Sequence, residues 1–163
     1  TSGYLCVWET GATDKPAVVW ESKLTPGDRV PAVVPGDKLV SAAWHPDGQR
    51  ISLAYRGAIL FWYLDGTTSP HGNRRRDEIA SAAWRPTGDS LLQSYAGGKA
   101  EISGWSGGGE DLTIERTAGF AAWSPDGTRV LTGSQDDHGA RIYIVDTGLL
   151  RTSLENVVYP SHR

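Results

Sequence analysis

The sequence predicts an all-β fold made of repeated four-stranded antiparallel sheets, and three observations lead to that prediction. One segment occurs three times in the 163 residues, as SAAWHPDGQRI from Ser41, SAAWRPTGDSL from Ser81 and FAAWSPDGTRV from Phe120. Its tryptophans are spaced by 40 residues (84 − 44) and then by 39 residues (123 − 84). Pro and Gly interrupt every window long enough for an amphipathic helix. A period of about 40 residues filled with short strands is the sequence signature of a β-propeller blade.

Each copy of the repeat can be divided into strands. The part that ends in Ala-Ala-Trp predicts a first strand, whose small alanines let neighbouring sheets approach closely. The tetrapeptides HPDG, RPTG and SPDG then predict tight turns, because proline fixes φ at the first central position and glycine accepts a positive φ. An apolar residue seven positions after each tryptophan begins the second strand: Ile51, Leu91 and Val130.

The remaining strands are predicted from apolar runs. Third strands are expected in AILFWYL, AEISGW and ARIYIV, and fourth strands in DLTIER and LLRTSLE; the fourth strand after Leu64 is poorly marked. Before the first copy, GYLCVWE and PAVVWES are predicted as a third and a fourth strand. The predicted organisation is one repeat segment over 1–163, with half of a blade at 1–23, blades at 39–78, 79–117 and 118–156, and the start of another at 157–163.

The number of blades predicts an incomplete propeller. Closed propellers contain roughly four to eight blades, and this sequence accounts for about three to four. We therefore expect a fragment of a longer polypeptide. Its free ends would expose apolar faces and strand edges, so we also expect either the remaining blades or self-association to cover them.

The repeat resembles that of the WD-repeat family of β-propellers, in which the third strand ends in Trp-Asp. The aromatic position of that pattern is assigned here to Trp8, Trp62, Trp105 and Tyr143. The residue that follows is Glu9, Tyr63, Ser106 or Ile144 in place of Asp, and the usual Gly-His pair is absent. We therefore expect the blades to lack the family's buried polar network. Their cores should rest on aromatic packing, with the repeated tryptophans Trp44, Trp84 and Trp123 as further core positions.

The stretch SGWSGGGE around Ser106 raises the alternative of a serine hydrolase, because G-W-S-G-G fits a nucleophile elbow. That elbow requires a following helix whose backbone N–H groups lie near the oxyanion. The sequence GGGEDLTIER predicts a turn and an outer strand instead. Asp136 and His138 follow in a suitable order, but in a loop predicted at the opposite end of the next blade. We therefore predict no catalytic residue and no enzyme activity.

Neither a metal nor a cofactor is expected. Asp136, Asp137 and His138 carry ligand groups, but consecutive side chains on a short loop do not converge on one ion, and no second set has ligand spacing. The stretch AGGKAE lacks the spacing of a phosphate-binding loop.

The charge and the cysteine content indicate which binding partners and which cellular compartment are expected. The net charge of −3 gives no global field towards nucleic acid or a membrane. No apolar run approaches the roughly 18 residues of a membrane helix. Cys6 is the only cysteine, which excludes an internal disulfide and favours a reducing compartment, so a cytoplasmic location is predicted.

One end of the blades is predicted to bind a protein or peptide partner. The candidate residues lie in loops between second and third strands or between blades: Arg56, Arg74, Arg75, Arg76, Lys99, Asp136, Asp137 and His138. The three consecutive arginines suit an acidic peptide or a phosphate. The alternative is a solvated loop, because Asp77 and Glu78 flank them.

The resemblance implies a non-catalytic protein–protein interaction scaffold or sensor module, part of a larger WD-repeat protein, in bacterial signalling. The alternative is a propeller of the TolB-like or peptidase-associated kind, whose repeats also carry SPDG. Such a propeller would act as a periplasmic adaptor or as a substrate gate. The regular aromatic third-strand position and the endings VWET and VDTG favour the WD-repeat assignment.

Overall fold

The computed structural model describes residues 3–9, 17–24, 38–65, 67–71, 77–104, 111–115, 117, 119–133, 139–146 and 149–153. The chain divides into two compact units, Thr1–Pro31 and Ala32–Arg163. In the first unit, β1 (Gly3–Glu9) pairs in antiparallel fashion with β2 (Ala17–Leu24), with a register shift between Val7 and Trp8. These two strands are the ones predicted ahead of the first repeat.

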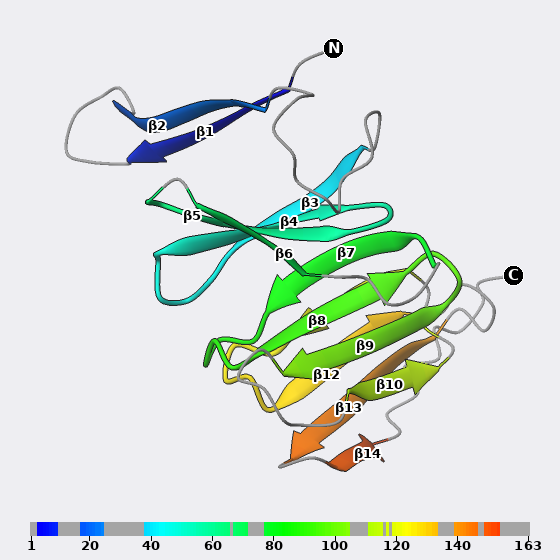
Figure 1. The fold of residues 1–163 in the computed structure, drawn as a ribbon. Coiled ribbons are helices and arrows are strands. Elements are labelled where there is room, and N and C mark those ends of the chain that lie inside the picture. Colours follow the sequence, from blue (N-terminus) through cyan, green and yellow to red (C-terminus); the bar gives the residue numbers. More distant parts are fainter. Residues whose placement is uncertain are drawn as a thin grey trace, which may run out of the picture. The chain divides into compact units, whose positions relative to one another are not determined.

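The described residues of the second unit form three four-stranded antiparallel sheets, each with its strands in chain order (Figure 1). Blade 1 consists of β3 (Leu39–Trp44), β4 (Arg50–Tyr55), β5 (Ile59–Tyr63) and β6 (Thr68–His71). Blade 2 consists of β7 (Ile79–Trp84), β8 (Ser90–Tyr95), β9 (Lys99–Gly104) and β10 (Leu112–Glu115). Blade 3 consists of β11 (Ala121–Trp123), β12 (Arg129–Gly133), β13 (Ala140–Asp146) and β14 (Leu149–Ser153). The predicted fold class is confirmed, and β6 is the strand that the sequence marks poorly.

The three Pro-Gly turns join first and second strands as predicted. Gly48, Gly88 and Gly127 have φ angles of 69°, 78° and 68°, a region that residues with a side chain rarely adopt. Their N–H groups donate to the carbonyls of the first turn residues, at 2.9, 2.8 and 2.9 Å. The local chemistry of proline and glycine thus sets the same hairpin three times.

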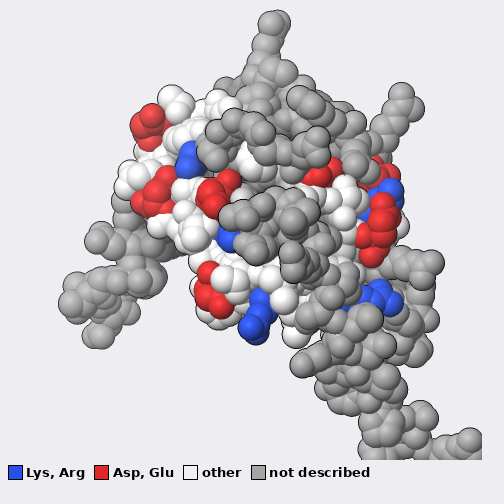
Figure 2. All heavy atoms as spheres, turned by 90° about the horizontal axis from the view of Figure 1, so that it is seen from below, with Lys and Arg blue, Asp and Glu red and all other residues white. Residues whose placement is uncertain are grey.

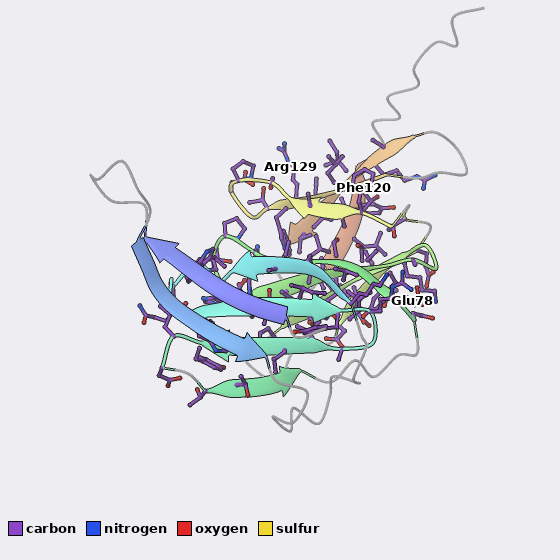
Figure 3. The ribbon with its side chains drawn as sticks, turned by 90° about the horizontal axis from the view of Figure 1, so that it is seen from above. Glu78, Phe120 and Arg129 are labelled. Carbon is purple, nitrogen blue, oxygen red and sulfur yellow. The ribbon has the colours of Figure 1, made fainter. Side chains whose placement is uncertain are left out.

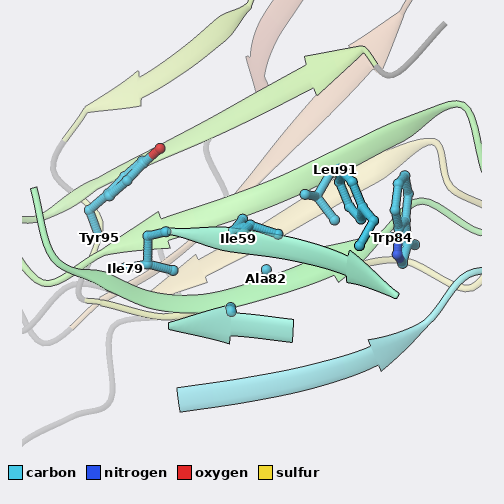
Figure 4. Packing of buried hydrophobic residues seen from close by; sticks show 8 residues of the cluster. Ile59, Ile79, Ala82, Trp84, Leu91 and Tyr95 are labelled. Carbon is cyan, nitrogen blue, oxygen red and sulfur yellow. The ribbon is translucent and has the colours of Figure 1, made fainter. Parts of the chain in front are cut away.

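Two apolar clusters lie between consecutive blades, and the middle strands of blades 1 and 2 are buried on both faces. The cluster between blades 1 and 2 contains Ala54, Ile59, Phe61, Ile79, Ala82, Trp84, Leu91 and Tyr95 (Figure 4). The cluster between blades 2 and 3 contains Leu92, Ala100, Ile102, Ile114, Val130, Tyr143 and Val145. Successive residues of a strand point to opposite faces, so Leu91 packs towards blade 1 and Leu92 towards blade 3.

The repeated tryptophans do not share one environment, which corrects the expectation that all are core positions. Trp84 is 7% exposed, whereas Trp44 is 50% exposed. Trp123 is partly buried and packs against the second cluster. The cause is the order of the sheets: blade 1 covers Trp84 and blade 2 covers Trp123, but no described sheet of the second unit precedes blade 1.

The aromatic third-strand position is also corrected in blade 2. Trp62 pairs with Ile51 and Tyr143 with Val130, and both aromatic side chains are buried. The residue paired with Leu91 is Ser103, so Ser103 and not Trp105 holds the equivalent position in blade 2. The side chains of Trp8 and Trp105 lie outside the described residues, as does Ser106.

Candidate interaction surfaces

We call the end of the blades that holds the β4–β5 and β8–β9 turns the Arg56 end. Arg56 Nη1 lies 3.6 Å from Glu78 Oε1, and Lys99 Nζ lies 3.3 Å from Glu115 Oε1. All four side chains are exposed, so each pair contributes only about 0–1 kcal/mol to stability. The structure therefore places the predicted residues Arg56 and Lys99 at one end, each beside a carboxylate.

Backbone hydrogen bonds hold the Arg56 end in place. Ile79 N donates to the Arg56 carbonyl at 2.8 Å, and Ala96 N donates to the Glu78 carbonyl at 2.8 Å. Thr117 N donates to the Gly98 carbonyl at 2.7 Å. The first of these bonds links blade 1 to blade 2. Exposed charged side chains thus project from a backbone that is fixed within and between blades.

The other predicted partner-binding residues are not described. Arg74, Arg75, Arg76, Asp136, Asp137 and His138 lie outside the described ranges, so their role stays a prediction. Figure 2 shows the molecule from below; on this face, the acidic and basic side chains of the described residues are interspersed. Among the described residues, no three His, Cys, Asp or Glu side chains are close enough to hold a metal ion. No helix of the described part is long and apolar enough to cross a membrane.

The opposite end of the blades carries the three turns between first and second strands, and we call it the Pro-Gly end. Figure 3 labels one residue from each end: Glu78 from the Arg56 end and Arg129 from the Pro-Gly end. Here the side chain of His45 crosses from blade 1 to blade 2. His45 Nε2 lies 2.9 Å from the Gly88 carbonyl oxygen, and the ring meets Trp84 edge-on with centroids 4.5 Å apart. His45 Nδ1 accepts from Asp47 N at 3.1 Å. Each ring nitrogen of His45 thus lies within hydrogen-bond distance of a backbone partner.

Two charged neighbours surround the His45 ring. Arg50 Nη2 lies 2.9 Å from Nε2, and its guanidinium carbon lies 5.6 Å from the Trp84 ring centroid. Asp47 Oδ1 lies 2.9 Å from Nδ1. Partial desolvation opposes ionisation of Asp47, but the Gln49 N–H, His45 and Arg50 together hold the pKa of that carboxyl below its ordinary value.

Arg85 makes the corresponding contact from blade 2 to blade 3. Its Nε donates to the Gly127 carbonyl at 2.8 Å, and its guanidinium carbon lies 5.4 Å from the Trp123 ring centroid. Its Nη1 lies 3.2 Å from Asp89 Oδ2. The residue equivalent to Arg50 in this turn is Ser90, so no second cation stands beside the guanidinium. Arg85 therefore contacts the next blade through a guanidinium group, where His45 uses an imidazole ring.

His45 and Arg85 hold the same repeat position, directly after the first strand, and we call them bridging residues. Each covers the turn glycine of the next blade: a Cβ on Gly88 would lie 2.8 Å from His45 Cε1, and a Cβ on Gly127 would lie 3.2 Å from Arg85 Cγ. The indole N–H groups of Trp84 and Trp123 have no hydrogen-bond partner among the described residues, so ring contacts hold both side chains. Glycine is thus required for its backbone conformation and for the space that the bridging residue occupies.

Sequence reasoning missed the bridging residues. The signal that was available is the first letter of each turn, which is basic in HPDG and RPTG and not in SPDG. It also missed a buried polar group in blade 2. There the Tyr95 hydroxyl lies 3.0 Å from Glu101 Oε2 and 3.2 Å from Gln93 Oε1, and Gln93 Nε2 donates to Ser103 Oγ at 3.0 Å. The blade cores therefore do not rest on aromatic packing alone.

Comparison with known proteins identifies the fold. No protein-family model and no curated protein sequence matches the chain. It is similar in structure to a chain of the mitotic checkpoint complex, with a TM-score of 0.58 and 19% sequence identity. The match covers 69% of this chain and 38% of that chain, so the sequence spans well under half of the solved relative. The three sheets are thus blades of a WD40-like β-propeller fold.

Proposed function

We propose that the chain is a non-catalytic protein–protein interaction module, a scaffold or sensor within a larger WD-repeat protein of bacterial signalling. The observation that carries this proposal is the contrast between the two ends of the blades. At the Pro-Gly end, the bridging side chains are engaged with the next blade. At the Arg56 end, charged side chains are exposed on a fixed backbone, an arrangement suited to recognition by a partner.

The chemistry of the Arg56 end suggests the kind of partner. Arg56 and Lys99 each have an acidic neighbour, and the two pairs present both signs of charge within one blade end. A protein surface or peptide with alternating charges would exchange these weak ion pairs for intermolecular ones at little cost. A cytoplasmic location is part of the proposal and rests on the single cysteine, Cys6.

The test is chemical cross-linking of the tagged full chain in cells of its source, followed by mass spectrometry of the captured proteins. Wild type is compared with the double variant Arg56→Glu/Lys99→Glu. The control is Arg129→Glu, which reverses an exposed charge at the Pro-Gly end. The proposal predicts a protein captured by wild type and control and lost from the double variant. Equal capture by all three would remove the Arg56 end as the binding surface.

A separate experiment addresses the absence of catalysis. A fluorophosphonate probe reacts with activated serine nucleophiles, so the folded chain is expected to remain unlabelled. Labelling of wild type that disappears in Ser106→Ala would contradict the non-catalytic assignment, whatever the cross-linking result.

A further inference from the structure

The buried polar group of blade 2 lies where blade 1 has apolar side chains. Gln93 pairs with Glu101 across β8 and β9, and Leu53 pairs with Leu60 at the equivalent place in blade 1. All four residues are buried. Two leucines would pack there at least as favourably, because polar side chains lose their hydration when they are buried. Packing alone therefore does not explain why blade 2 has Gln93 and Glu101 at these positions.

Tyr95 connects the buried polar group to the β8–β9 turn. It is the last residue of β8, and its hydroxyl lies within hydrogen-bond distance of Glu101 Oε2 and Gln93 Oε1. Its carbonyl accepts from Gly98 N at 3.1 Å, which closes the turn that leads to Lys99, the first residue of β9. The side chain and the backbone of one residue thus join the buried group to the turn.

Lys99 lies at the exposed end of a row of side chains that includes part of this group. Alternate residues of a strand point to one face, so Lys99 shares a face of β9 with Glu101 and Ser103. The Lys99 side chain is 39% exposed, whereas Glu101 and Ser103 are buried. Gln93 Nε2 donates to Ser103 Oγ, which continues the hydrogen bonds along this row. The row therefore runs from the Arg56 end into the interior of the molecule.

We propose that the buried polar group is a positioning group, which holds the β8–β9 turn so that Lys99 contacts a carboxylate of the protein partner. This inference rests on the proposed function of the Arg56 end. A surface site loses less side-chain and loop entropy on binding when its residues are already held in place. Hydrogen-bonded side chains inside a blade fix a geometry more specifically than apolar packing does. On binding, Lys99 exchanges Glu115 for the carboxylate of the partner.

Two variants remove the hydrogen bonds of the group. Gln93→Leu/Tyr95→Phe/Glu101→Leu makes it apolar, and this triple variant should resist urea at least as well as wild type. Tyr95→Phe removes only the hydroxyl that joins the group to the turn. Its matched control is Tyr55→Phe, since Tyr55 holds the equivalent position in blade 1 and is also buried.

Hydrogen exchange of the full chain measures the turn and needs no partner. In both variants the amides of Ala96 and Gly98 should exchange about tenfold faster, since local opening no longer breaks the hydrogen bonds of the Tyr95 hydroxyl. The amide of Tyr55, which donates to the Ala58 carbonyl in the blade 1 turn, should exchange as in wild type. Tyr55→Phe should leave the amides of Ala96 and Gly98 unchanged.

Cross-linking in cells of the source then measures recognition by the partner. The protein that wild type captures and Arg56→Glu/Lys99→Glu loses should also be lost from the triple variant, although the triple variant is no less stable in urea. A group with a structural role alone would change the stability and leave the capture as it is in wild type.

Two results would overturn the proposal. Unchanged exchange at Ala96 and Gly98 in both variants would show that the buried group does not hold the turn. Faster exchange with undiminished capture would show that the partner does not require a fixed turn, provided that Arg56→Glu/Lys99→Glu does lose the partner. If that charge-reversed variant captures as much as wild type, the proposed function of the Arg56 end fails, and the role of Lys99 fails with it.

Discussion

The two interfaces between blades use one repeat position with different chemistry. Between blades 1 and 2, the imidazole ring of His45 contacts the Gly88 carbonyl, and Trp84 is buried against Phe61 as well as His45. Between blades 2 and 3, Arg85 acts as a cation, and Trp123 stays partly exposed. The residue five positions after the bridging residue also differs: it is Arg50 in the first case and Ser90 in the second.

The largest expected change in stability is for removal of a tryptophan ring, and it should differ between Trp84 and Trp123. Trp84→Ala should lower the free energy of unfolding by about 3–5 kcal/mol, because it empties a buried ring site between blades 1 and 2. Trp123→Ala should cost roughly half as much, since that ring is partly exposed. Urea unfolding followed by circular dichroism measures both. Equal losses would mean that the two interfaces do not differ in burial.

The turn glycines provide the next comparison. Gly48→Ala should cost about 1–2 kcal/mol, the strain of a side chain at positive φ. Gly88→Ala carries the same strain and also displaces the His45 ring, so it should cost about 1 kcal/mol more. The same urea titrations apply, with Gly48→Ala as the matched control. A Gly88→Ala loss no larger than the control would show that His45 does not occupy that space.

Replacing His45 by arginine, the bridging residue of blade 2, tests the role of the neighbouring Arg50. His45→Arg should destabilise the chain by about 1–2 kcal/mol, because it places a second guanidinium beside Arg50. The double variant His45→Arg/Arg50→Ser recreates the blade 2 pair of Arg85 and Ser90. It should be more stable than expected from adding the separate effects of His45→Arg and Arg50→Ser. If His45→Arg is neutral by itself, repulsion from Arg50 does not select histidine.

The aspartates of the turns predict a loss of stability in acid. Hydrogen bonds from Ser124 and from the Thr128 backbone and hydroxyl lower the pKa of Asp126 to about 2 from 3.8. A carboxyl with a lowered pKa binds fewer protons in the folded state, so its contribution is present above pH 3.8 and is lost as the pH falls through about 2. Unfolding midpoints measured across this window should depend less on pH in Asp126→Asn. An unchanged slope would contradict the assignment.

The smallest effects are expected at the Arg56 end. Arg56→Ala and Lys99→Ala should each change the free energy of unfolding by less than about 0.5 kcal/mol, because both ion pairs are exposed. A large loss of stability in either variant would show that the residue contributes to packing between blades. It would also remove the contrast between the two ends on which the proposed function rests.

Local chemistry explains why the strands and turns could be predicted. Proline and glycine determine each hairpin within four residues, so three turns were predictable without knowledge of the rest of the chain. The length of the hairpins between second and third strands was not predictable in this way. In blade 1 the pairing closes with Ala54 opposite Ile59, and in blade 2 with Tyr95 opposite Lys99. Counting along the sequence therefore placed Trp105 where the register places Ser103.

The bridging residues illustrate the limit of a reading along the chain. His45 and Arg85 contact carbonyls 43 and 42 residues away, in a turn of the next blade. A repeat alignment shows that the first turn residue varies, but only the order of the sheets reveals what it meets. The same order explains why Trp44 is exposed although it holds the position of Trp84.

The most direct test of the bridging contact is a double-mutant cycle between His45 and Gly88, measured by urea unfolding of wild type, His45→Ala, Gly88→Ala and the double variant. If the His45 ring covers Gly88, then Gly88→Ala should cost about 1 kcal/mol less in the His45→Ala background than in wild type. Its cost there should match that of Gly48→Ala, where nothing lies over the glycine. Strict additivity of the two substitutions would contradict the contact between blades 1 and 2.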